Sequence, residues 1–173
     1  MKINISNLSQ GTHEYELSKS AVNLGLEQNF IGDVAAKVTL EKSSRQMLLR
    51  AGVSSHANFQ CDRCLDEFKQ RIAPAFQTLY VWNHDERAEN DDVRVLAPDM
   101  NIIDISDDVR DALVLAVPLK LLCKEACFGL CRRCGKNLNH TADGICDCAP
   151  KEVDPRWNKL SGLVEVSILT KKN

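Results

Sequence analysis

The chain has 173 residues, 44% of them hydrophobic, and a formal net charge of −2. This composition suits one domain with a small appendage and excludes a protein that holds a polyanion by bulk positive charge. The longest apolar run, residues 112–119, contains Pro118 and is too short to span a bilayer. The start of the chain, MKINISNLSQ, shows no apolar signal segment, so we expect a cytoplasmic protein whose thiols stay reduced.

The first 82 residues favour β-strands, because short β-prone runs show apolar–polar alternation. Pro74 favours an edge or a bulge, since proline cannot donate a ladder hydrogen bond. The sequence predicts an α+β fold built on a β-rich antiparallel sheet or partial barrel. Strands are expected at residues 2–5, 13–17, 30–40, 47–59 and 72–82.

An acid-rich connector at residues 85–92 is predicted to be a solvated loop, followed by short strands at 93–96 and 101–103. A helix near 105–117 comes next, with Asp104 or Ser106 as its N-cap and Pro118 at its end. Its apolar side chains recur every four residues, at Ile105, Val109, Leu113 and Val117. We expect this helix to cover the sheet, so that residues 1–120 form a β-rich core domain.

Residues 121–173 are expected to form a cysteine-rich zinc module that resembles a zinc ribbon. Cys131 and Cys134 are separated by two residues, so both sulfurs can grip one side of a tetrahedral ion. Gly135 follows, where a left-handed backbone lets N–H groups turn toward the thiolates. Cys146 and Cys148 can close the other side of the ion. These four cysteines are called the second quartet below.

Two earlier pairs, Cys61/Cys64 and Cys123/Cys127, are called the first quartet. They share a second zinc ion if the end of the strand before Cys61 meets the segment after the helix. Each pair alone is two ligands short of the usual four. One zinc ion plus four thiols remains an open alternative, and His140 can replace a cysteine of the second quartet as a ligand.

Eight thiolates in two sets of four leave no open coordination position, which indicates structural zinc and no catalysis. Disulfides are the alternative for an even cysteine count, and they are typical of secreted proteins. The sequence contains no phosphate-binding glycine loop and no carboxylate–histidine metal motif, so we expect no enzyme. A short helix is expected after Asp154, with Trp157, Leu160 and Leu163 on one face.

The run LLCKEACFGLCRRCGKNLN, followed by CDC and DPRW, resembles the YceD family of large ribosomal RNA subunit accumulation proteins. The earlier CDRCLDEF is similar to the first cysteine pair of that family. The resemblance covers roughly residues 55–160. It implies a bacterial or plastid protein with a β-rich α+β fold, a role in the accumulation of large-subunit (23S) ribosomal RNA, and no enzyme activity.

We therefore expect a non-catalytic zinc protein in ribosome biogenesis, whose direct partner is ribosomal RNA, a ribosomal protein or an assembly protein. The cations around the second quartet can contact phosphates, or they can merely neutralise the thiolates. An aromatic ring there can stack on a base, or can pack on its neighbours. A redox-responsive zinc chaperone or sensor is the alternative function. The candidate contact residues are Lys124, Phe128, Arg132, Arg133 and Lys136.

Overall fold

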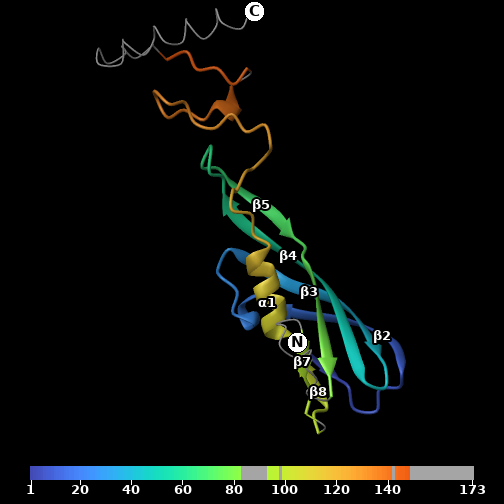
Figure 1. The fold of residues 1–173 in the computed structure, drawn as a ribbon. Coiled ribbons are helices and arrows are strands. Elements are labelled where there is room, and N and C mark those ends of the chain that lie inside the picture. Colours follow the sequence, from blue (N-terminus) through green and yellow to red (C-terminus); the bar gives the residue numbers. More distant parts are fainter. Residues whose placement is uncertain (83–92, 98, 142, 149–173) are drawn as a thin grey trace, which may run out of the picture. The chain divides into compact units, whose positions relative to one another are not determined.

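The computed structural model describes residues 1–82, 93–97, 99–141 and 143–148, which form two compact units. The strand unit comprises Met1–Asp62 and Asp66–Glu125, and it contains the strands and the helix labelled in Figure 1. The cysteine unit comprises Arg63–Leu65 and the chain from Ala126 onward. No helix in the described ranges combines the length and apolarity that crossing a membrane requires.

The strand unit is built on a six-stranded mixed sheet in which β2–β3–β4–β6–β7 are neighbours and β5 also pairs with β4. All pairs are antiparallel except β6 and β7, which run parallel. The prediction of a strand-rich fold is thus confirmed, but the sheet is mixed because its edge pair, β6 and β7, is parallel. The strands are β2 (Gly11–Ser20), β3 (Phe30–Lys42), β4 (Gln46–Gln60), β5 (Glu67–Ile72), β6 (Ala75–Val81) and β7 (Val93–Val95).

Proline splits the strand that the sequence predicts at residues 72–82. Pro74 has no N–H to donate, so the hydrogen-bonded pairing with β4 is interrupted there. The carbonyl of Pro74 still accepts the backbone N–H of Val53 at 2.8 Å. β5 precedes the break and β6 follows it, and both pair with β4. Sequence reasoning missed β5 because its residues, EFKQRI, are mainly charged or polar.

A second, two-stranded sheet joins β1 (Lys2–Asn4) to β8 (Ile102–Asp104), and β8 leads directly into α1 (Ser106–Leu115). The helix begins and ends inside the predicted range 105–117. Its apolar face is buried, with Ile105, Val109 and Leu113 at 0% exposure. These side chains belong to one apolar cluster with the inward residues of β3 and β4, which stabilises the strand unit.

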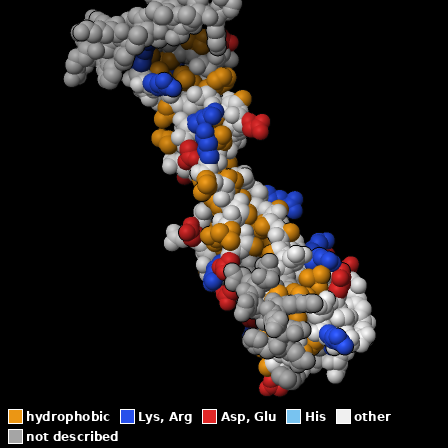
Figure 2. All heavy atoms as spheres, in the orientation of Figure 1, with side chains coloured by type: hydrophobic (Ala, Val, Ile, Leu, Met, Phe, Trp, Pro, Cys, Tyr) orange, Lys and Arg blue, Asp and Glu red, His pale blue; other side chains and the backbone are white. Residues whose placement is uncertain are grey.

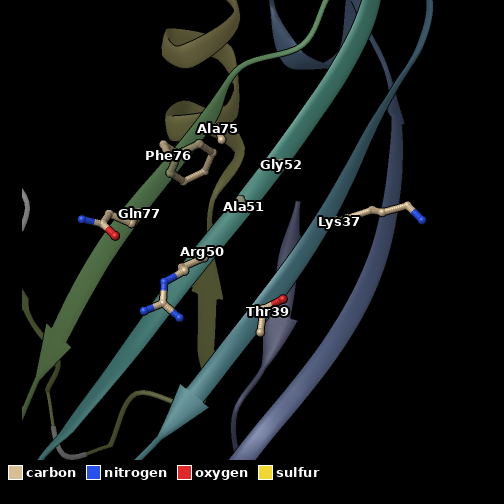
Figure 3. Close-up of a pocket in the computed structure, with 8 residues that line it drawn as sticks. All are labelled: Lys37, Thr39, Arg50, Ala51, Gly52, Ala75, Phe76 and Gln77. Atoms are coloured by element: carbon tan, nitrogen blue, oxygen red, sulfur yellow. The ribbon is translucent and has the colours of Figure 1, made fainter.

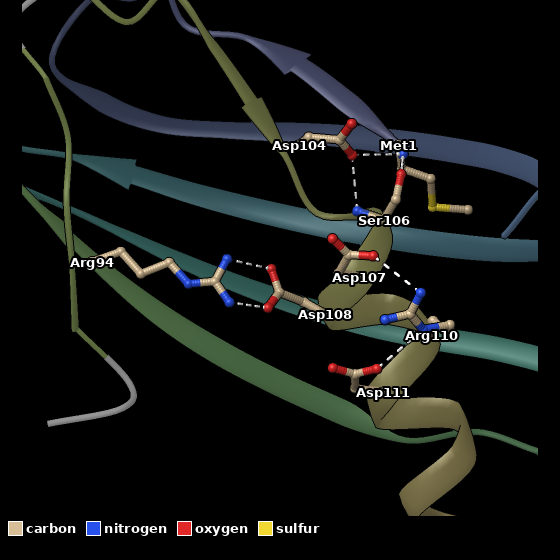
Figure 4. A network of polar contacts seen from close by, with 8 residues as sticks. All are labelled: Met1, Arg94, Asp104, Ser106, Asp107, Asp108, Arg110 and Asp111. Atoms are coloured by element: carbon tan, nitrogen blue, oxygen red, sulfur yellow. Dashed lines mark hydrogen bonds and ion pairs between the residues drawn. The ribbon is translucent and has the colours of Figure 1, made fainter. Parts of the chain in front are cut away.

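Side-chain hydrogen bonds hold the start of α1 (Figure 4). Asp104 Oδ1 accepts the backbone N–H of Ser106 at 2.9 Å and lies 3.1 Å from the amino nitrogen of Met1. The predicted N-cap residues thus contact each other, while the cap position itself is Ile105, which has no capping side chain. Arg94 of β7 donates to Asp108 through both terminal guanidinium nitrogens, which ties the edge strand to the helix.

Turns account for most of the described cysteine unit. Leu130 and Asn137 form an isolated β-bridge, and Leu138–His140 form a 3₁₀ turn. Within residues 63–65 and the described part from 126 to 148, the buried apolar side chains are those of Cys64 and Cys127. An apolar core therefore does not order this part. The acidic loop at 85–92 and the helix expected after Asp154 lie outside the described residues.

Candidate metal centres and the adjoining surface

The structure brings the eight cysteines together in the two predicted quartets. Within each quartet all four Sγ atoms lie within 4.8 Å of one another, and none of the eight cysteines forms a disulfide. Sulfurs bound at about 2.3 Å to a tetrahedral zinc ion would lie roughly 3.8 Å apart. Both quartets therefore fit one four-coordinate ion each. His140 is not needed to complete either set.

The two Cys-x2-Cys turns share one backbone geometry. Cys61 N–H donates to Asp66 O at 2.9 Å, and Cys131 N–H donates to Lys136 O at 2.8 Å. The residue after the second cysteine is left-handed in both turns, with φ 63° at Leu65 and φ 74° at Gly135. The predicted conformation of Gly135 is confirmed. The same turn at Leu65 costs backbone strain, because a side chain disfavours this conformation.

Backbone N–H groups prepare the second quartet for a cation. The N–H groups of Cys134 and Arg133 lower the pKa of the Cys131 thiol to about 6. The hydrogen bond between Cys131 and Cys148, 3.5 Å between sulfurs, raises the pKa of Cys148 to about 12. One thiolate thus forms at neutral pH without metal, and a bound divalent cation would displace the remaining protons.

The quartets differ in exposure. Three sulfur ligands of the first quartet, Cys61, Cys64 and Cys127, are buried, at 0–4% exposure. Cys134 of the second quartet is exposed, and its other three cysteines are half-buried. Water and small reagents therefore have readier access to the second quartet than to the first.

Asn139 is a site residue that sequence reasoning missed. Its Nδ2 donates to Cys127 Sγ at 3.3 Å, and its Oδ1 accepts the backbone N–H of Phe128 at 3.0 Å. Asn137 Oδ1 in turn accepts from Asn139 at 3.0 Å. Such a donor supports a metal-bound thiolate from outside the coordination shell. The asparagine-rich run after Gly135 was the available signal, since asparagine side chains often bond nearby backbone.

Arg63, inside the first Cys-x2-Cys turn, was also missed. Its guanidinium donates to Cys127 O at 3.0 Å, and its own carbonyl accepts the N–H of Leu130 at 3.0 Å. A Cβ at Gly129 would lie 3.0 Å from that carbonyl. The turn and the segment around Cys127 are therefore in close backbone contact, which requires glycine at 129.

Three of the five predicted contact residues line one hollow beside the second quartet. This hollow of ≈ 330 Å³, called the Phe128 hollow below, combines apolar, guanidinium and sulfur-bearing side chains. Lys124 and Lys136 are exposed. On the face shown in Figure 2, basic and acidic side chains are interspersed, so binding of an anion depends on local contacts. The lining residues are Phe128, Leu130, Cys131, Arg132, Arg133, Leu138, Cys146 and Cys148.

A second hollow is lined by side chains of β3, β4 and β6 (Figure 3). Its floor includes Gly52, where a Cβ would meet nothing within 4 Å. Lys37 at its rim pairs with Glu16 at 2.9 Å, and Arg50 contacts Glu41. The hollow reflects a missing side chain, and its charged groups are already paired.

A family model described as large ribosomal RNA subunit accumulation protein YceD matches residues 49–164, which include all eight cysteines. The chain belongs to the YceD family. The predicted family is thereby confirmed. The match begins within β4 and runs through α1 and both quartets.

Relatives of this YceD-family chain occur in bacteria and plants. An uncharacterized protein of Mycobacterium tuberculosis is 28% identical over 79% of this chain and 64% of its own length. A Bacillus subtilis protein, YlbN, is 24% identical over 78% of this chain and 76% of its own. The chain thus spans less than two thirds of the mycobacterial relative. No solved structure gives a significant match.

A plant relative has a functional name. The large ribosomal RNA subunit accumulation protein YCED homolog 1, chloroplastic, of Arabidopsis thaliana is 38% identical over 39% of this chain and 20% of its own length. The similarity to that protein therefore covers a limited segment of each chain.

Proposed function

We propose that this protein is a non-catalytic zinc-binding factor that supports accumulation, processing or stability of large-subunit ribosomal RNA. The observation that carries the proposal is the convergence of eight cysteines, all within the family match, into two four-sulfur clusters. Sets of four thiolates saturate zinc, so the ions would shape the protein and activate no water. The name of the plant relative supports the ribosomal role.

Zinc is the metal that this donor set favours. Four thiolates in tetrahedral arrangement are typical of structural zinc or of iron–sulfur centres, and Cys-x2-Cys turns of this kind commonly hold a single zinc ion. Native mass spectrometry of reduced, freshly purified protein is expected to show two zinc ions per chain. Zinc-free protein under those conditions would contradict the metal assignment.

The ribosomal role is tested by sedimentation. We expect the chain, in extract of its own bacterial cells, to co-sediment with large-subunit precursors and to crosslink to their RNA or proteins. Its depletion is expected to lower the ratio of large-subunit to small-subunit ribosomal RNA. A chain found only at the top of the gradient, without crosslinks to precursor particles, would contradict this role.

A redox-responsive zinc chaperone or sensor is the second candidate, and the exposure of Cys134 is the observation that favours it. Oxidation of an accessible thiolate would release zinc from the second quartet. Zinc release under mild peroxide, followed with a chromogenic chelator, measures this property. Retention of both ions while free glutathione is oxidised would rule the sensor out.

A further inference from the structure

Phe128 is 55% exposed, yet close contacts hold its aromatic ring in place. A Cβ at Gly144 would lie 2.6 Å from its Cδ1 atom, so the ring packs directly on the glycine backbone. The backbone N–H of Phe128 is held by Asn139 Oδ1. The position of the ring is therefore set before any partner arrives, which lowers the entropic cost of binding.

Two guanidinium groups adjoin this ring in the Phe128 hollow. Arg132 and Arg133 are both exposed. Within the part of the chain that the structure describes, neither guanidinium forms an ion pair or a side-chain hydrogen bond. Cys131 Sγ instead accepts the backbone N–H of Arg133 at 3.5 Å. The guanidiniums are thus available to an anion, unlike Lys37 and Arg50 on the sheet.

The size and lining of the hollow restrict its occupant. A volume of ≈ 330 Å³ is at the lower end for ligand pockets. Leu130 and Leu138 make the wall beside the ring apolar, and both are half-buried. A flat, apolar-faced group attached to a phosphate suits this combination of walls and cations. An unstacked nucleobase with its adjoining phosphates has these properties, and stacking on an aromatic ring is how proteins commonly hold such a base.

We infer that the Phe128 hollow binds one unpaired base of single-stranded RNA, with the ring of Phe128 stacked on the base and Arg132 and Arg133 on the adjoining phosphates. This inference rests on the proposed ribosomal function and specifies the RNA element that it uses. Paired bases in an A-form duplex stay stacked and do not reach the ring. Loops, bulges and unfolded stretches of precursor RNA are therefore the expected substrates.

The test measures binding of zinc-loaded full-length protein to a short fluorescein-labelled single-stranded RNA of mixed sequence by fluorescence anisotropy. Phe128→Leu is expected to weaken binding about tenfold, because a leucine fills space without stacking. Phe128→Trp retains an aromatic face and is expected to bind as tightly as the parent. The same RNA annealed to its complement is expected to bind more weakly than the single strand.

Charge is tested with a matched pair of double variants. Arg132→Gln with Arg133→Gln is expected to reduce the slope of log affinity against log salt by about 0.7 per lost phosphate contact. Lys69→Gln with Arg71→Gln removes the same charge from exposed positions on β5 and is expected to change affinity less than twofold. Native mass spectrometry is expected to show two zinc ions in each variant.

Equal affinity of the Phe128→Leu and Phe128→Trp proteins, equal binding of duplex and single strand, or no binding of RNA would each overturn the inference. If the Phe128→Leu protein loses zinc, the test rests on the double variant Arg132→Gln with Arg133→Gln. An unchanged slope of log affinity against log salt in that variant would overturn the inference. Co-sedimentation with precursor particles that persists in the Phe128→Leu protein would leave the proposed function standing with a protein partner. Absence of co-sedimentation of the parent protein with precursor particles would instead contradict the proposed function itself.

Discussion

The first and second quartets share a turn but differ in protection. Both begin with a Cys-x2-Cys turn closed by the same backbone hydrogen bond and followed by a left-handed residue. The first quartet has three buried cysteines, and the second has none. Local sequence thus sets how a pair of sulfurs is presented, whereas the surrounding chain sets how accessible the ion would be. We expect the first quartet to act mainly in stability and the second to shape a contact surface.

Removing one sulfur ligand is expected to have a much larger effect on thermal stability at the first quartet than at the second. Cys61→Ser is expected to release one zinc ion and to lower the melting temperature of the strands by about 10 °C, because Cys61 is fully buried and directly follows β4. Cys134→Ser is expected to release one ion with a much smaller change. Thermal unfolding followed by circular dichroism, with native mass spectrometry for zinc, checks both. Equal shifts in melting temperature would contradict the division of roles.

The strand unit should owe its stability to its apolar cluster as well as to zinc. Leu113→Ala removes a side chain at 0% exposure and is expected to lower the free energy of unfolding by about 2–4 kcal/mol. Leu115→Ala, at 85% exposure on the same helix, is expected to change it by less than about 0.5 kcal/mol. Urea unfolding measures both. Similar losses for the two variants would show that α1 does not bury the face described above.

The left-handed residue differs between the two turns, so glycine can be introduced in one turn and removed from the other. Leu65→Gly is expected to stabilise the first turn by up to about 1 kcal/mol, because glycine adopts φ 63° without the steric penalty of a side chain. Gly135→Ala introduces that penalty at φ 74° and is expected to weaken zinc retention at the second quartet. Competition with a chelator of known affinity measures both. A Leu65→Gly protein that holds zinc less tightly would show that the leucine side chain stabilises the turn by more than its backbone strain costs.

The smallest expected effect concerns a site remote from either turn, at the start of α1. Hydrogen bonds from Ser106 hold the pKa of Asp104 well below its usual range. The ionised Asp104 carboxylate therefore stabilises the fold fully above its unfolded-state pKa of about 3.9. This stabilisation is lost as the pH falls through the pKa of Asp104 in the folded state. Asp104→Asn is expected to cost roughly 0.5 kcal/mol, since solvent screens a half-exposed carboxylate.

That cost is expected to be constant from about pH 6.5 to about pH 5 and to shrink below about pH 4. Urea unfolding at several pH values measures it, and Asp111→Asn on the same helix serves as the exposed control. A difference that grows as the pH falls would show the opposite sign of linkage and would contradict the role given to Asp104.

Most of the strands and the helix could be predicted from the sequence, because apolar alternation and four-residue spacing report directly on which face is buried. The strand β5 could not, since EFKQRI is held by its pairing with β4 and carries little apolar signal of its own. The parallel pairing of β6 with β7 was also beyond prediction, because it depends on where the chain returns after residue 92.

The sequence by itself determined the family, the cysteine pairs and the turn that each Cys-x2-Cys motif adopts, because these depend on neighbours a few residues apart. Tertiary structure decided that Cys61 and Cys64 meet Cys123 and Cys127, across about sixty residues of chain. It also decided that Asn139 supports Cys127 and Phe128. Spacing constrains atoms that are close along the chain, whereas only the packed strands and helix can bring distant sulfurs within reach of one ion.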